Sequence, residues 1–247
     1  FISLDIMART RAISLDINTQ ALLGSSKDEF NFEFNKHIDI AFEKIEFLDN
    51  QDILEFDKAH QAYNFTYCFK VKGSDQVILA MIQNGKIRVL DEAKIREQII
   101  TPLNKEQLFF SNAILQHYYN VLIVEAKAGS GKTLLALSGA LKLIKRKEYQ
   151  RIIYIRNSIE SLDKGEDIGY LPGYEEKFKI YNHPLMDSLD YIIRSEHKKR
   201  HGNKKEVYEP LEDNEVASRV EQLITQYNIE TMWVGEMRGR TLSNAFV

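Results

Sequence analysis

Within the first half of the chain, residues 61–91 carry a hydrophobic and polar pattern typical of β-strands. Residues 63–71 alternate aromatic and polar side chains, and two further apolar runs, 76–82 and 87–90, flank Asn84-Gly85. An Asn-Gly pair between two such runs is typical of a tight β-hairpin turn. The pattern therefore predicts a small β-meander over residues 61–91.

The second half switches between strand-like apolar runs and stretches with the period of amphipathic helices. Thr101-Pro102 marks the change, because proline biases its predecessor away from helix. The pattern predicts strands at 121–125, 151–155 and 229–234, and helices at 104–115, 133–147, 184–194 and 214–227. Strands that alternate with helices form a parallel sheet with helices on its faces. We therefore expect an α/β fold with a parallel sheet of at least three strands.

These changes of pattern predict three domains. A strand-like piece followed by a helical stretch forms a first segment, 1–22. An acidic stretch interleaved with Phe and Ile leads into the meander, and together they form a β-rich connector, 23–100. The helix and strand alternation defines the domain 101–247. Phe1 reads as a cut end and 244–247 as the start of a buried strand, so we expect an internal piece of a longer protein.

Charge and cysteine content exclude several classes of protein. A formal net charge of -3 and an isoelectric point near 6.1 argue against indiscriminate binding of polyanions, so contact with nucleic acid needs a local basic patch. The single cysteine, Cys68, has no partner for an intrachain disulfide or a CxxC zinc site. No apolar run approaches the about 20 residues that cross a bilayer. We expect a cytoplasmic protein without a membrane span.

A phosphate-binding loop is predicted between the strand at 121–125 and the helix at 133–147. Its candidate nucleotide-binding residues are Ala126, Lys127, Ala128, Gly129, Ser130, Gly131, Lys132 and Thr133. The two glycines let backbone N–H groups converge on phosphate oxygens at a helix N-terminus, where free amides and the helix dipole favour an anion. The Lys132 ammonium would neutralise phosphates, and the Thr133 hydroxyl would bind Mg²⁺.

One position departs from the usual pattern of such loops, which opens with glycine. Ala126 takes that place, and its methyl group fits if its φ is negative. A glycine-rich turn that binds no ligand is the alternative to a phosphate site. The Gly-Lys-Thr ending and both flanks favour nucleotide binding, but the loop by itself does not define the reaction.

Four stretches of the second half resemble the PhoH family of P-loop ATPases, whose core is similar to the first domain of superfamily 1 helicases. They are 101–107 (TPLNKEQ), Arg156 with 165–173 (GEDIGYLPG), 175–178 with 184–187, and 237–242 (MRGRTL). The chain has Arg156-Asn157 where family members have Arg-Pro. The resemblance implies a three-layer, RecA-like P-loop NTPase domain.

The resemblance also implies how the site works. Gln107 would read adenine with its side-chain amide, and Mg²⁺-dependent hydrolysis of ATP would drive unwinding or degradation of RNA. Arg238 and Arg240 would stabilise charge on the γ-phosphate across a subunit boundary of a homo-oligomeric ring. An ion pair at the sheet edge is the alternative for these arginines. The candidate catalytic residues are Lys132, Thr133, Arg238 and Arg240.

The first segment resembles the end of a PIN nuclease domain, which precedes the ATPase in one form of the family. Asp5 would be one of several carboxylates around a divalent metal in such a domain. A helix cap is the alternative role for Asp5. Because the other carboxylates are missing and the acidic Walker B strand of the family only begins at 244–247, we expect no nuclease activity from this chain, and ATP binding better than turnover.

Two other functions stay open. A P-loop kinase for a small molecule would share residues 121–155 but would have no use for Gln107, and a nucleotide-gated binding module would bind without productive hydrolysis. A basic run at 197–201, with Lys204 and Lys205, would hold an RNA backbone through its phosphates or form a solvated loop.

Overall fold

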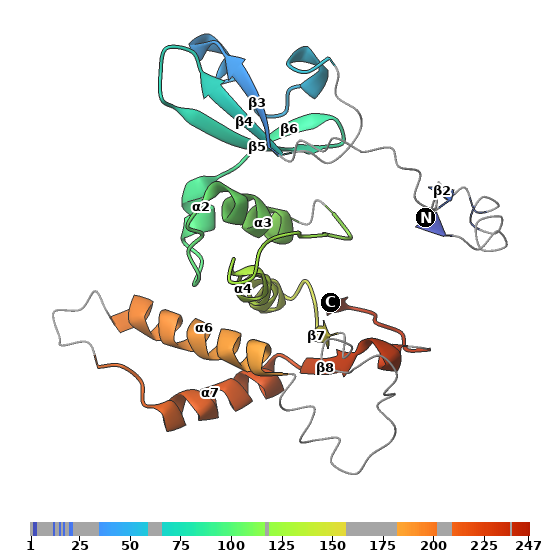
Figure 1. The fold of residues 1–247 in the computed structure, drawn as a ribbon, viewed down its shortest axis with the longest axis vertical. Helices are drawn as coiled ribbons and strands as arrows, with labels where there is room; N and C mark the ends of the chain where they lie inside the picture. The colour runs from blue at the N-terminus through green and yellow to red at the C-terminus, as the bar shows by residue number, and fades with distance from the viewer. Residues whose placement is uncertain are drawn as a thin grey trace. The chain divides into compact units, whose positions relative to one another are not determined.

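The computed structural model of the chain describes residues 2–3, 12, 15, 17, 20–21, 35–58, 66–116, 119–156, 182–201, 209–237 and 239–247 (Figure 1). Its contacts separate a unit of residues 1–36 from a unit of residues 37–247. In the first unit, β1 (Ile2–Ser3) pairs in parallel with β2 (Gln20–Ala21). Asp5 lies outside the described residues, and the division into three domains stays a prediction.

The predicted meander is present in the larger unit. Its sheet has the order β3-β4-β5-β6, from β3 (Asn35–Ile40), β4 (Thr66–Val71), β5 (Val77–Gln83) and β6 (Lys86–Val89). The strands β5 and β6 are antiparallel and join through Asn84 and Gly85, whose φ angles of 51° and 75° are both left-handed. Two left-handed residues match the twist of a two-residue hairpin, which confirms the predicted turn.

Both faces of this sheet are buried. One face, with Tyr67, Phe69 and Ile82, packs against Ile40 and residues of the segment that follows β3. The other face packs on the helix α3 (Lys105–Gln116) through a cluster that includes Cys68, Leu79, Met81, Leu108, Phe109 and Ala113. The meander and α3 therefore share one hydrophobic core, which fixes the position of α3 at the start of the helical half.

The second half of the larger unit is built on a parallel sheet. The strand β7 (Arg151–Arg156) lies between β8 (Ile229–Trp233) and β9 (Ala245–Phe246), and both pairings are parallel. Helices precede β7 and β8 in the chain, as parallel connections require. The predicted α/β fold with a parallel sheet is confirmed.

The helices form a packed row beside this sheet (Figure 1). After the short α2 (Glu92–Arg96), α3 packs on α4 (Lys132–Lys145), α4 on α6 (His183–His201), and α6 on α7 (Asp213–Gln226). Short 3-10 turns are η1 (Phe42–Lys44), η2 (Ile53–Glu55) and η4 (Val234–Met237). The core between helices and sheet includes Leu135, Leu141, Ile152, Leu189, Ile192, Val216 and Ile229. Within the described ranges, no helix is long and apolar enough to cross a bilayer.

The predicted strand at 121–125 is wrong for this structure. The segment carries no strand pairing, and Val121 and Ile123 are 77% and 90% exposed. A strand needs a partner with free backbone groups along its length. In the described part of the sheet, neither edge strand pairs with this segment: β9 spans 2 residues, and β8, at the other edge, pairs only with β7.

The basic run at 197–201 is helical, so its interpretation as a loop is wrong. The helix α6 continues to His201 instead of ending at 194. Arg200 pairs with Glu196 one turn earlier at 2.5 Å, and cations in a last turn are favoured by the helix dipole. Lys204 and Lys205 lie outside the described residues.

The contact between α3 and α4 depends on the absence of a side chain at Gly139. A Cβ at this position would lie 2.7 Å from Ile114 Cγ2. Ala is favoured over Gly in a helix interior by about 1 kcal/mol. The variant Gly139→Ala therefore sets the steric clash with Ile114 against the higher helix propensity of alanine. We expect Gly139→Ala to lower the free energy of unfolding in the wild-type chain and to raise it in an Ile114→Ala background, as measured by urea denaturation. If Gly139→Ala changes the free energy of unfolding in the same direction in both backgrounds, this packing is contradicted.

Candidate nucleotide-binding site

The loop before α4 bends at its two glycines. Gly129 has a φ of 73° and Gly131 has a φ of 82°, and Gly131 caps α4 in the left-handed conformation. A side chain is strained at such angles, which explains glycine at both positions. Ala126 is not among the residues with positive φ, so its methyl group is tolerated where glycine is usual. The backbone thus has the bend that a phosphate-binding loop needs.

The start of α4 leaves backbone donors available. The first bond of the helix ladder runs from Leu135 N to Gly131 O at 2.9 Å. The amides at the start of the helix have no helical acceptor, and the positive end of the helix dipole lies at the same point. Thr133 is half-buried in this first turn. Its hydroxyl is the oxygen ligand that the loop itself could offer to a divalent cation.

The Lys132 side chain folds back into the loop. Its ammonium donates to the carbonyl oxygens of Ala126 at 2.6 Å and Lys127 at 2.9 Å, and lies 3.5 Å from Ser130 Oγ. Three polar atoms of the loop thus surround a cation that has three protons to donate. The positive charge is held within the bend, where an anionic ligand of the loop would meet it.

Gln107 connects the start of α3 to the same loop. Its Nε2 donates to Ser130 O at 3.1 Å, and its Oε1 accepts from Leu103 N at 2.7 Å. The Asn104 carboxamide caps the helix by accepting from Gln107 N at 2.9 Å. Gln107 therefore sits beside the loop, and both ends of its amide are engaged within the chain. Its role in reading adenine stays a prediction.

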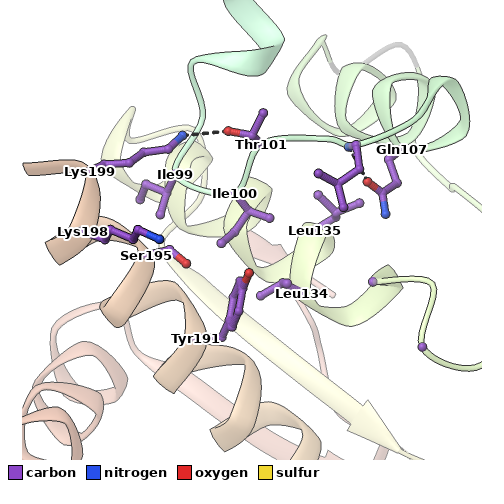
Figure 2. Close-up of a pocket in the computed structure, with 13 residues that line it drawn as sticks. Ile99, Ile100, Thr101, Gln107, Leu134, Leu135, Tyr191, Ser195, Lys198 and Lys199 are labelled. Carbon is purple, nitrogen blue, oxygen red and sulfur yellow. Dashed lines mark hydrogen bonds between the residues drawn. The ribbon is translucent and has the colours of Figure 1, made fainter. Parts of the chain in front are cut away.

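A cavity of about 610 Å³ opens beside the loop (Figure 2). This volume falls in the range of about 300–1,000 Å³ that is typical of small-molecule sites. Its walls come from the segment before α3, from the loop with α4, and from α6, and they comprise Ile99, Ile100, Thr101, Leu103, Gln107, Gly129, Gly131, Leu134, Leu135, Tyr191, Ser195, Lys198 and Lys199. The sequence motifs indicated Gln107 and the glycines but placed no residue of α6 here, because Tyr191 and Ser195 belong to no motif and the basic run with Lys198 and Lys199 was assigned to RNA or a loop.

Arg240 lies at the far end of the sheet from the loop. Glu230 of β8 accepts from Arg151 at 3.0 Å and lies 3.5 Å from Arg240 Nη2. Arg151 is the first residue of β7, six residues after Lys145 at the end of α4, and the 14 residues of α4 span about 20 Å. The ion pair expected as the alternative is thus present. Arg238 lies outside the described residues, as do 165–173 and 175–178, and the catalytic role of both arginines stays a prediction.

Cys68 takes no part in this site. The side chain is buried between the meander and α3. Burial raises the pKa of its thiol, because removal from water disfavours the thiolate. Cys68 is therefore a packing residue.

The fold and the loop define a P-loop nucleotide-binding domain: a parallel α/β sheet, a glycine bend at a helix N-terminus, and a lysine held inside the bend. A profile of the PhoH-like protein family matches residues 99–247. The chain belongs to this family, which is one of P-loop ATPases.

Curated relatives support the assignment. The chain is 31% identical over 153 residues to a PhoH-like protein of Synechocystis and 32% identical over 121 residues to a PhoH-like protein of Bacillus subtilis, which covers 62% and 49% of this chain. It is 35% identical over 98 residues, or 39% of the chain, to Protein PhoH2 of Bacillus subtilis. The aligned regions span 38%, 30% and 22% of these relatives.

The backbone angle of Gly131 generates a test of the site. A Cβ there would lie 3.5 Å from Gln107 Nε2, an ordinary contact, so the cost of Gly131→Ala comes from strain at positive φ. We expect a loss of about 1–2 kcal/mol in unfolding free energy and about tenfold weaker ATP binding, because relaxed amides no longer converge. Calorimetric titration and denaturation measure the two effects.

Gly73 supplies the matched control. It has a φ of 77° in the turn between β4 and β5, and a Cβ there would meet no atom within 4 Å. Gly73→Ala is expected to carry a similar cost in stability with unchanged ATP affinity. Equal losses of affinity in both variants would mean that Gly131 acts through stability alone.

Proposed function

We propose that this chain binds Mg²⁺-ATP at residues 126–133 and that the intact protein hydrolyses it to act on RNA. The observation that carries the proposal is the Lys132 ammonium inside a glycine bend at the start of α4, beside a cavity of nucleotide size. Membership of a family of P-loop ATPases supports it.

In this proposal the chain binds the triphosphate with its backbone. The amides of the loop and the first turn of α4 donate to phosphate oxygens, and Lys132 exchanges the carbonyls of Ala126 and Lys127 for phosphate. Thr133 would hold Mg²⁺ through its hydroxyl, and the metal would neutralise charge on the β- and γ-phosphates. Gln107 joins the loop to α3, so it is positioned to sense the nucleotide through Ser130.

The position of Arg240 supports action between subunits. About 20 Å of helix α4 separates its end of the sheet from the loop of the same chain. An arginine at that end would reach a nucleotide only in a neighbouring subunit, as a homo-oligomeric ring allows. In this proposal Glu230 holds Arg240 until a neighbour docks, and Arg238 acts with it.

Further parts of the proposal rest on the resemblance. The end of a PIN nuclease domain in residues 1–22 would couple the ATPase to RNA degradation. The basic last turn of α6, with Arg200 and His201 exposed, would meet the RNA backbone. The intact protein would work in the cytoplasm.

ATP turnover by the intact protein, with and without single-stranded RNA, separates this function from its rivals. RNA-stimulated hydrolysis is the expected result. Phosphorylation of a small molecule would instead support a kinase, and binding without turnover would support a nucleotide-gated module.

Three substitutions test whether ATP binds at the loop. We expect Lys132→Ala to weaken ATP binding about 100-fold or more, because charge-assisted hydrogen bonds to phosphate are lost, and to abolish turnover. Lys70→Ala on β4 removes an equal exposed charge, and Asp5→Ala removes the nuclease candidate; both should leave ATP affinity unchanged. Equal losses in all three variants would refute the loop as the site.

A further inference from the structure

The helix α6 presents two different faces. One face is buried in the core through Leu185, Leu189, Ile192 and Ile193. Tyr191, Ser195 and Lys198 follow one another at intervals of four and three residues, which places them on one stripe of the helix. All three line the cavity beside the loop. Figure 2 shows this stripe facing the segment before α3 and Leu134 of α4.

Hydrogen bonds hold α6 in place on both sides. Lys199 donates to Thr101 Oγ1 at 2.9 Å and to Gln98 O, which joins the helix to the segment before α3. Arg194 donates to Asp213 Oδ1 at 2.7 Å and to Leu211 O at 3.1 Å, which joins it to the start of α7. A side chain on this helix therefore meets a ligand with little cost of ordering.

Tyr191 is the large aromatic side chain of this wall. Its residue is 56% exposed although it lies beside Leu134 and Ile100 (Figure 2). An aromatic face in an apolar cavity is completed by another flat ring, and stacking of a nucleobase on such a face is favourable for every base. A triphosphate bound at Gly129 and Gly131 would direct its nucleoside into the same cavity, toward the wall that α6 provides.

We propose that Tyr191 is a nucleoside-contacting residue, and that α6 forms the base end of the ATP site. This inference rests on the proposed nucleotide function. It adds a nucleoside-binding wall on α6, outside the phosphate-binding loop. Ser195 and Lys198 continue the stripe and supply hydrogen-bond donors to the base or ribose. In this arrangement the P-loop recognises phosphate while α6 recognises the nucleoside.

Competition with two ligands tests the proposal on the chain as it exists. We expect Tyr191→Ala to weaken ATP binding about tenfold, the scale of a lost aromatic stack, and to leave the affinity for inorganic tripolyphosphate unchanged. Tyr191→Phe should bind both ligands like the wild type, because the ring is kept. Met186→Ala, on the same helix but outside the cavity, is the control for helix substitutions.

The outcomes distinguish this inference from the function on which it rests. Equal ATP affinity in Tyr191→Ala and the Met186→Ala control would overturn the role of Tyr191, provided that the wild type binds ATP. Parallel loss of ATP and tripolyphosphate would also overturn it, because the effect would then lie at the phosphates. Failure of the wild-type chain to bind ATP, tested against Lys132→Ala, would overturn the proposed function itself.

Discussion

The site depends on one constraint of the backbone: the chain must turn through two left-handed glycines directly before α4 begins. This bend brings the loop around the Lys132 ammonium and leaves the first amides of α4 without helical partners. Neither effect needs a precisely placed side chain other than the lysine. A loop of this kind concentrates positive potential from the backbone, which explains why it suits phosphate whatever molecule carries it.

The rest of the structure keeps that bend in position. The meander packs on α3 through a shared core, and α3 presents Gln107, whose amide bonds to the loop at Ser130. On the other side, α4 packs on α6, and Lys199 joins α6 to the segment before α3. The cavity is thus lined by elements far apart in the sequence.

The sequence predicted the parts whose structure is local. The hairpin at Asn84 and Gly85, the helix after the loop and the α/β class follow from turn chemistry and periodicity, and the structure confirms them. The segment 121–125 has the composition of a strand but pairs with no described strand, and pairing is not visible in composition. The basic end of α6 was misjudged because charge alone does not separate a loop from an exposed helix turn.

The parts of the site that the sequence missed depend on tertiary placement. Tyr191 belongs to no motif, and only the packing of α6 on α4 brings it to the cavity. Arg240 lies in a motif, and its ion pair was an expected alternative, but its separation from the loop by the length of α4 follows only from the fold. Motifs therefore identified the phosphate end of the site, while the fold was needed for its walls.

A crystal structure of the chain with Mg²⁺ and a nonhydrolysable ATP analogue is the most direct measurement. The account predicts phosphate oxygens within hydrogen-bond distance of the amides from Gly129 to Thr133, with the Lys132 ammonium moved from the Ala126 carbonyl onto phosphate. An analogue bound elsewhere, or loop amides directed away from the triphosphate while Lys132 keeps its present partners, would contradict it.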